Sequence, residues 1–508
     1  MWYIPGHNTN MSDNTISVPV HPRRDPRFPE RISSEVLKNI FADCSDLQTR
    51  EIAPGLKSVR TLTVIWIDGL TDGTAVADEI LRPLTGFLRS SGTVSPERLM
   101  RGAVYSASAQ LRTDTDSLVS DLLQGCCAVI FDDEHSAVSF EVRTKNQRSI
   151  DEPTLEKSVK GSKDSFVETL RTNTSLVRRR LCDPALKLRS TVIGRKTMTR
   201  VGIFYLDGVC DPALVAELER RLDAIDVDNA LATGVLEEYV VDSPASPMPQ
   251  LLHTERPDRF ARQLVAGRAG ILVDGIPIGF LVPASLPEFM RVAQDETQHY
   301  AVASALSLVR WLALILALLL PAFYVAVAMY HQEMIPTKLL LSVISSKQDV
   351  PFSTALEVLG MLVAFDLLQE AGLRLPDPVG DTVSIIGALI VGQSAVDASV
   401  ISPVAVIVVA LSGIAGFALP SQDMGAAVRL SRFALVLAAI LGGLFGVTAL
   451  FCLMLWHVCT LDSFGRSYTA PLSGGRRHAL GRTLLRRPKP SEKFREPELN
   501  TPDKRRQA

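Results

Sequence analysis

An internal repeat in the first 300 residues constrains the fold of this chain more than any other feature of its sequence. Residues 64–72 align with residues 203–211, and each run is an apolar stretch that ends in Asp-Gly and is followed by a second Asp. Farther along, residues 125–133 align with residues 267–275 at a similar offset. Because a duplication fixes the domain plan, the sequence predicts two lobes that share one fold.

The sequence around the repeat indicates the class of that fold. Apolar runs of strand length alternate with charged stretches of helical length, which is typical of α/β proteins. We expect a first α/β lobe over residues 36–150 and a second over residues 151–295, the second including a linking helix. Residues 1–35 are expected to be disordered. Residues 1–30 lack the apolar core of a secretory signal, so we expect the N-terminal part in the cytoplasm.

The aspartates at the expected strand ends admit two interpretations. Asp68, Asp132, Asp207 and Asp274 could converge as catalytic or metal-binding carboxylates. Alternatively, each closes its own turn, with glycine at positive φ and the Asp side chain bonded to the turn backbone. Repetition of the turn in both lobes favours the second interpretation. Since no nucleophile elbow, P-loop, dinucleotide-binding glycine motif or zinc-protease motif is present, we expect no enzymatic activity, cofactor or metal.

Charge and cysteine content exclude further classes. The 508 residues include 53 Lys and Arg against 55 Asp and Glu, a net charge of -2. Without a global basic field, we do not expect binding to nucleic acid through bulk phosphate neutralisation. The seven cysteines form no Cys-x-x-Cys pair, and the adjacent Cys126 and Cys127 are poorly placed to bridge each other. We therefore expect reduced thiols.

A basic helix is expected in the linking part of the second lobe. Small residues around Lys160 precede a helical stretch that ends in Arg178, Arg179 and Arg180. These four cations could contact an anionic ligand or a neighbouring subunit, with backbone N–H groups at a helix start assisting Lys160. The alternative is an ordinary capped helix whose basic end suits the helix dipole.

Composition changes abruptly after residue 300, and we expect an α-helical transmembrane bundle over residues 300–460. The expected spans are residues 311–329, 383–400, 402–419 and 433–456. Residues 352–371 contain Glu357 and Asp366, so we expect them to form a re-entrant or interfacial element.

The C-terminal segment sets the expected orientation. Residues 461–508 carry twelve Lys and Arg against five Asp and Glu, which the positive-inside rule places in the cytoplasm as a basic, solvated tail. With both termini cytoplasmic, the number of spans is even. Arg429 and Arg432 do not fit this orientation, since they lie at the opposite end of the last expected span.

Polar residues interrupt one of the apolar segments. Gln393, Ser394 and Asp397 lie at expected membrane depth, where polar groups normally face protein or water. Together with Ser384 and Gly387 they could line a pore if several copies assemble around one axis. Close packing between helices, in which small residues and Gln side chains join neighbours, is the alternative.

At this point several motifs resemble those of the GerA family of spore germination proteins. The motifs are VKGS at 159–162, FVETLRTN at 166–173, VRRRL at 177–181, TERPD at 254–258, VPASLPEF at 282–289, HQEMIPT at 331–337, GQSAVD at 392–397 and SFG at 463–465. The similarity extends from about residue 158 to 470 and is weaker before it.

The resemblance implies the A subunit of a nutrient germinant receptor in the inner membrane of a bacterial endospore. It implies a two-lobed cytoplasmic domain, a membrane bundle surrounded by lipid and a short cytoplasmic tail. Implied partners are a permease-like B subunit that binds the nutrient and a lipoprotein C subunit. The A subunits are taken to form an oligomeric, pentameric, ligand-gated ion channel that triggers germination by cation release.

The sequence departs from the family pattern at two places. The family usually has Gly-Gln-Ala-Ala-Val-Glu-Ala-Gly at the positions of residues 392–399, where this chain has Asp397 in place of the Glu and Ser399 in place of the last Gly. The second departure is Leu362, which stands where the family commonly has a Glu. A sporulation-stage channel protein of the same family and a membrane scaffold for the nutrient-binding subunit are the alternative functions. A secondary transporter is disfavoured because the hydropathy shows no inverted repeat. Channel and scaffold differ in whether Gln393 and Asp397 contact water.

Overall fold

The structure is a computed structural model that describes most of the chain. The described residues are 27–52, 62–91, 94–104, 108–144, 153, 156, 160–230, 232–373, 392–473 and 479–506. They divide into two compact units. The first comprises Met1–Ile40, Gln48–Ile67 and Thr71–Arg143, and the second comprises Phe41–Leu47, Asp68–Leu70 and Thr144–Ala508.

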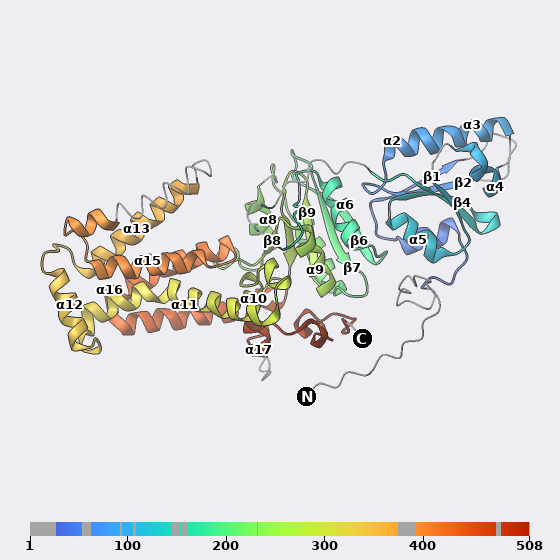
Figure 1. Ribbon diagram of the computed structural model, residues 1–508. Helices are drawn as coiled ribbons and strands as arrows, with labels where there is room; N and C mark the ends of the chain where they lie inside the picture. Colours follow the sequence, from blue (N-terminus) through green and yellow to red (C-terminus); the bar gives the residue numbers. More distant parts are fainter. Residues whose placement is uncertain are drawn as a thin grey trace, which may run out of the picture. The chain divides into compact units, whose positions relative to one another are not determined.

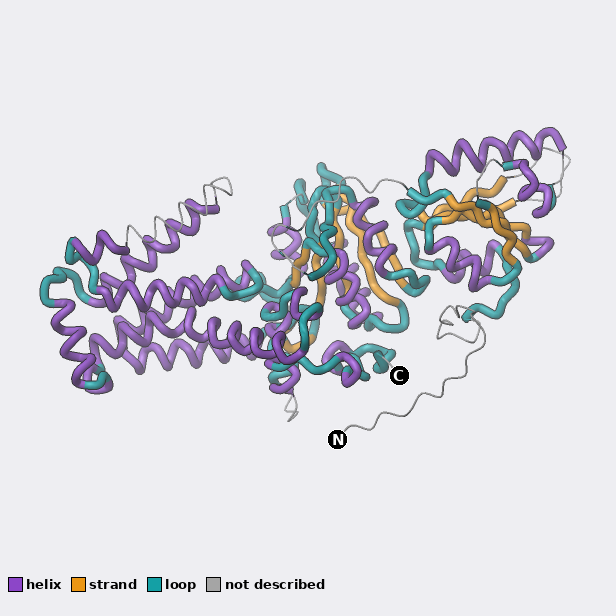
Figure 2. Tube along the Cα trace, in the orientation of Figure 1, coloured by secondary structure: helices purple, strands orange, loops and turns teal. Residues whose placement is uncertain are grey.

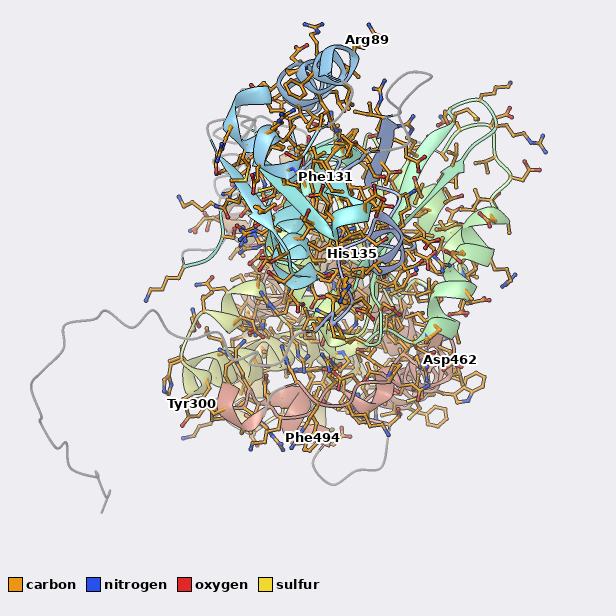
Figure 3. All side chains as sticks on the ribbon, turned by 90° about the vertical axis from the view of Figure 1, so that its right-hand side faces the viewer. Arg89, Phe131, His135, Tyr300, Asp462 and Phe494 are labelled. Atoms are coloured by element: carbon orange, nitrogen blue, oxygen red, sulfur yellow. The ribbon has the colours of Figure 1, made fainter. Side chains whose placement is uncertain are left out.

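The first unit is built on a five-stranded sheet (Figure 1). Its strands are β1 (Leu47–Ile52), β2 (Leu62–Ile67), β3 (Ala109–Arg112), β4 (Cys126–Phe131) and β5 (Ser136–Glu141), in the order β1-β2-β4-β5-β3. The pairs β2–β4, β4–β5 and β3–β5 are antiparallel. All six residues of β4 are buried, and the last of them, Phe131, is labelled in Figure 3. Such burial requires cover on both faces of the sheet.

Helices supply that cover. The continuous helical stretch α2 (Gly73–Ala75), η1 (Val76–Leu81) and α3 (Arg82–Ser91) lies over one face, and α5 (Thr115–Leu123) lies over the other (Figure 1). The shorter elements of this unit are α1 (Ser34–Ile40), α4 (Pro96–Arg98), η2 (Leu99–Ala103) and η3 (Asp132–Glu134). The result is a helix–sheet–helix sandwich, which agrees with the expected α/β lobe.

The second unit contains a sheet of the same topology. Its strands are β6 (Leu186–Ile193), β7 (Thr199–Leu206), β8 (Leu252–Thr254), β9 (Ala269–Val273) and β10 (Gly279–Val282), in the order β6-β7-β9-β10-β8. Helices α7 (Pro212–Asp223) and α8 (Thr233–Val240) pack on one face. Helices α6 (Leu170–Arg180) and α9 (Pro257–Ala266) pack on the other, where Phe260 meets Phe204 edge to face.

The strand register confirms the internal repeat. In the sequence alignment Val64 corresponds to Ile203, and Val129 corresponds to Ile271. Val64 pairs with Val129 across the first sheet, and Ile203 pairs with Ile271 across the second. The two lobes therefore share strand order and register, as a duplication requires.

Between Tyr300 and Thr460 the described residues are almost entirely helical (Figure 2). The main helices are α11 (Tyr300–Tyr330), α12 (Thr337–Lys347), α13 (Thr354–Leu373), α15 (Pro403–Phe417) and α16 (Gln422–Thr460). Side chains from α11, α13, α15 and α16 share one apolar core, which includes Val325, Leu362 and Leu435. Among the described residues, α11 and α16 are long and apolar enough to cross a membrane, and α15 is a shorter apolar helix.

These helices locate the expected spans. Helix α11 contains the span expected at 311–329, α15 lies within 402–419, and α13 covers most of the element expected at 352–371. Residues 383–391 of the remaining expected span, with Ser384 and Gly387, lie outside the described residues. Residues 392–397 are helical.

The single span expected over 433–456 is wrong, because α16 reverses inside it. Gly442 and Gly443 have non-helical backbone angles, with φ of +54° at Gly443. A Cβ added to Gly446 would lie 2.2 Å from the carbonyl oxygen of Ala438, so the chain folds back on itself at this point. Two glycines inside a long apolar run permit a reversal that hydropathy alone does not reveal.

The two ends of α16 confirm the reversal. As a straight helix its 39 residues would extend about 58 Å. Yet Asp423 at its start lies 2.8 Å from His253, and His457 near its end lies 2.8 Å from Ser246, both in the second lobe. Residues 422–441 and 444–460 therefore form a helical hairpin with both open ends on that lobe.

The segment after α16 folds onto the second lobe, so the expectation of a solvated tail is wrong for its described residues. It forms a small hairpin of β11 (Asp462–Ser463) and β12 (Arg466–Ser467), where Arg466 pairs with Asp211 at 2.5 Å. Tyr468 is fully buried. Some of the basic side chains that suggested solvation instead pair with carboxylates earlier in the chain, as Lys489 does with Glu296. The remaining short elements are α10 (Leu286–Phe289), η4 (Ala293–Glu296), η5 (Gln332–Met334), α17 (Ala479–Leu484), η6 (Lys489–Ser491) and η7 (Pro497–Leu499).

Candidate functional site

The repeated Asp-Gly pairs are turns. Gly69, Gly208 and Gly275 have φ of +85°, +74° and +88°, the left-handed region that glycine adopts without strain. The four aspartates bind four different groups. Asp68 accepts a hydrogen bond from the Arg171 guanidinium at 2.6 Å, and Asp132 accepts the N–H of Ser34 at 2.6 Å. Asp207 accepts the N–H of Gly208 at 3.0 Å, and Asp274 accepts the N–H of Leu170 at 2.8 Å. The described residues contain no cluster of three or more side chains suited to a metal ion.

The basic helix predicted from sequence is α6, and its first arginine is a structural residue. Arg178 is 1% exposed, and its Nε and Nη2 each donate to the Asp46 carboxylate at 2.8 Å. Burial alone would lower the pKa of Arg178, but the charge and hydrogen bonds of Asp46 outweigh it and raise the pKa. A buried, bidentate pair of this kind joins α6 to the segment before β1.

The other basic candidates lie nearer the surface. Arg180 pairs with Asp164 and Ser162, Arg179 is partly buried, and Lys160 is exposed. At the N-terminus of α6, Asp274 accepts the N–H of Leu170, so a carboxylate already occupies part of the position that an anion would take. A role for these cations at a ligand or subunit contact stays a prediction.

The pore-lining candidates form an exposed polar segment. Gln393, Ser394 and Asp397 are all exposed on a short helical stretch. The stretch ends at Ser399, which has φ of +52°. This is the position where the family pattern has glycine, so the departure noted in the sequence places a serine in a backbone conformation that favours glycine.

A buried carboxylate lies directly beyond this segment. Glu357 of α13 has a fully buried side chain, and its Oε1 lies 3.0 Å from the Lys347 ammonium. Its Oε2 accepts the backbone N–H of Ser402, the N-cap of α15, at 2.8 Å. Glu357 therefore joins α12, α13 and the start of α15, and it fixes the point where the polar segment enters α15.

Polar partners on α13 explain the positions of the two arginines, Arg429 and Arg432, that did not fit the expected orientation. Arg432 of α16 is 3% exposed, and its Nη2 lies 3.1 Å from Asp366 of α13. Its Nη1 donates to Ser412 of α15, which in turn donates to a carbonyl of α11. Arg429 donates to Gln369 at 3.3 Å. Sequence reasoning noted Asp366 and Arg432 separately; the signal for pairing was two opposite charges in otherwise apolar helices.

Ionisable residues also join the second lobe to α16. His253 of β8 lies 2.8 Å from Asp423. Burial would lower the pKa of His253, but the hydrogen bond and charge of Asp423 outweigh it and raise the pKa. Burial and the charge of Asp423 raise the pKa of Glu237. The lobe and the first helix of the hairpin are thus held together by groups that can titrate.

Comparison with known proteins identifies relatives over nearly the whole chain. The sequence is 34% identical over 491 residues to "Spore germination protein KA" of Bacillus subtilis, which covers 96% of this chain and 90% of that protein. It is 36% identical over 466 residues to "Uncharacterized membrane protein YfkQ" of the same organism, covering 91% and 89%.

One solved structure is also similar. It is the crystal structure of the N-terminal domain of the A subunit of the Bacillus megaterium spore germinant receptor GerK3, 29% identical, with a TM-score of 0.41. The match covers 51% of this chain and 98% of that one. The family model for the Bacillus/Clostridium GerA spore germination protein matches residues 35–498. This chain belongs to the GerA family of spore germination proteins.

Proposed function

We propose that this protein is the A subunit of a nutrient germinant receptor and that several copies of it, as in a pentamer, form an ion channel. Membership of the GerA family supports a role in germination. The observation that carries the channel is the exposed polar segment of Gln393, Ser394 and Asp397 beside apolar helices. Exposed polar groups in such a setting are favourable when they face water, and a pore shared by several copies supplies that water.

We place both termini in the cytoplasm, and the packing of the helices supports a position of the second lobe and the C-terminal segment on the same side of the membrane. Helix α11 leaves the second lobe, α15 returns to it, and the α16 hairpin leaves and returns once more, so the C-terminal segment ends on the lobe. Residues 422–441 and 444–460 are about 30 and 26 Å long, close to the thickness of a bilayer core. The outward faces carry large exposed apolar side chains, such as Ile414, Phe445 and Trp456, which suits lipid.

The proposed channel opens in response to a nutrient bound elsewhere. We place the protein in the spore inner membrane with a permease-like B subunit, which binds the nutrient, and a lipoprotein C subunit. Two rigid features suit gating. The buried pairs Lys347–Glu357 and Arg432–Asp366 hold α13 against α12 and α16. Nutrient binding would then shift the polar segment relative to that framework.

The proposal is tested by single-channel recording. The purified chain, alone and with its B and C partners, is placed in a planar bilayer before and after addition of amino acids or sugars. Asp397→Asn removes one negative charge per copy from the proposed path and is expected to lower cation selectivity. Because the side chain is exposed and nearly the same size, assembly should be unchanged.

The matched control is Asp349→Asn, which removes the same charge from another exposed position, in the turn between α12 and α13. Currents altered by Asp397→Asn and unaltered by Asp349→Asn support the channel. Silence from an assembled complex that binds nutrient would instead identify the chain as a scaffold that relays the signal to another conduit.

A further inference from the structure

A basic cavity lies where the second lobe, the start of α11 and the C-terminal segment meet. Its volume is about 210 Å³. Eight Arg or Lys side chains and five Asp or Glu side chains line it, which leaves a net charge of +3. Phe494 of the C-terminal segment, labelled in Figure 3, forms part of the wall. An excess of guanidinium and ammonium groups around a cavity attracts anions.

The carboxylates of this cavity are already neutralised by neighbouring cations. Glu288 is a buried residue of its lining, where it pairs with Arg291 and accepts a hydrogen bond from Gln263 at 2.9 Å. Burial would raise the pKa of Glu288, but the charges of Arg291 and Arg268 outweigh it and lower the pKa to about 2. The remaining four pairs are Asp295 with Arg310, Glu296 with Lys489, Glu492 with Arg506 and Glu496 with Arg268.

Three cations that line the cavity have hydrogen-bond donors that no carboxylate of the described residues accepts. Arg487 and Lys493 form no ion pair with any described residue, and both line the cavity. In the part of the chain that the structure describes, the carboxylates paired with Arg262 lie 3.8 and 3.9 Å away, which is too far for a hydrogen bond. The hydroxyls of Ser307 and Ser491 also line the cavity. Guanidinium and ammonium groups beside hydroxyls match the oxygen atoms of a phosphoryl group.

The cavity lies beside the first turns of an apolar helix. Its wall includes Ala303 and Ser307 of α11, one to two turns before Trp311. Large apolar side chains on the same turns are exposed, with Leu306 at 41% and Val309 at 57%. Polar groups that bind a phosphate next to an exposed apolar helix suit the interface between water and lipid, where headgroup and acyl chain lie side by side.

From these observations we infer that the cavity is a binding site for a phosphoryl anion, held by Arg487, Lys493 and Arg262. Two sources have this chemistry: the headgroup of an anionic phospholipid, and a free phosphate or phosphate ester. The site joins the C-terminal segment to α11 and the lobe, so an anion bound there would fasten that segment. The inference does not depend on ion conduction by the chain.

The test uses the full chain purified in a neutral detergent. Calorimetric titration is carried out with inorganic phosphate, with glycerol 1-phosphate, and with mixed micelles that contain phosphatidylglycerol or phosphatidylcholine. The double variant Arg487→Gln, Lys493→Gln is expected to weaken saturable binding at least tenfold. The control Lys196→Gln, Arg200→Gln removes two charges from exposed positions in the β6–β7 hairpin and should bind as the unchanged chain does.

The outcomes separate the two sources. Saturable binding of phosphatidylglycerol micelles, without binding of phosphatidylcholine micelles or free phosphate, supports a lipid headgroup. Saturable binding of inorganic phosphate or glycerol phosphate supports a soluble ligand. The inference is overturned if neither probe binds saturably, or if both double variants lose affinity equally. Thermal unfolding of both variants in the same detergent verifies that they are folded.

Discussion

The carboxylate of Asp274, at the end of β9, accepts the backbone N–H of Leu170 at 2.8 Å and so caps the start of α6. The first lobe repeats this relationship, since Asp132 at the end of β4 accepts the N–H of Ser34 at 2.6 Å at the start of α1. Asp132 and Asp274 are also paired in the sequence repeat. The duplication therefore preserved the bond that fastens each leading helix to its sheet.

Removing this cap should destabilise the second lobe. Asp274→Ala leaves the first N–H of α6 without its partner, and the loss of a capping carboxylate costs about 1 to 2 kcal/mol. Thermal unfolding of the full chain in detergent measures the effect. Asp207→Ala is the matched control, because within the described residues its carboxylate accepts a hydrogen bond from the adjacent Gly208 N–H alone. Equal destabilisation by both changes would contradict a special role for Asp274.

For the buried pair of Arg178 and Asp46, removing one partner should destabilise the protein much more than removing both. Asp46→Ala leaves a guanidinium that is 1% exposed without its counter-charge, which should cost about 3 to 5 kcal/mol in the free energy of unfolding. The double variant Asp46→Leu, Arg178→Met removes both charges and should recover most of that loss. Denaturant unfolding of the three proteins decides the matter. A double variant less stable than Asp46→Ala would show that the pair itself is strongly stabilising.

Ser399 carries a prediction about the polar segment. A non-glycine residue at φ of +52° costs about 1 to 2 kcal/mol relative to a relaxed backbone. Ser399→Gly should therefore stabilise the helical region by about that amount, which thermal unfolding in detergent would detect. If stability falls instead, the Ser399 side chain contributes an interaction that outweighs the strain.

The junction between lobe and hairpin should weaken as the pH rises. The folded pKa of His253 lies above its ordinary value of 6.5, so its stabilising contribution is complete below about pH 6.5 and is lost as the pH rises through the folded pKa. The pKa of Glu237 is also raised, above 4.5, and its contribution falls in the same direction. Thermal unfolding at a series of pH values from about 5 to about 9 measures how the stability changes with pH.

The variant that isolates this effect is His253→Gln. It keeps a hydrogen-bond donor for Asp423 without a titrating charge, so the stability should depend less on pH than in the unchanged chain. An unaltered pH dependence would show that the junction contributes little to it.

Sequence reasoning predicted the two lobes well and the helical region less well. The repeat aligned Val64 with Ile203 and residues 125–133 with 267–275, and the structure pairs these strands in the same register in both lobes. It did not show which strands are neighbours within a sheet. It could not show that the sheets are antiparallel. It also missed the reversal at Gly443, since hydropathy averages over a break of two residues.

The candidate site could be predicted only in part. Gln393 and Asp397 could be singled out from the sequence because they are polar residues within an apolar stretch. Long-range partners were not, because Arg432 and Asp366 are 66 residues apart and only the packed helices bring them together. The tail was misjudged for the same reason, as the basic residue Arg466 finds its carboxylate at Asp211, 255 residues earlier.

The central claim is that the polar segment faces a water-filled path, and cysteine modification during current recording tests it most directly. Gln393→Cys places a thiol on the proposed path, and the unchanged chain, with its seven free cysteines, is the control. A charged, membrane-impermeant thiol reagent should reduce the current through Gln393→Cys and leave that of the unchanged chain as it was. An open channel whose current is insensitive to the reagent at Gln393→Cys and also at Asp397→Cys would contradict the account.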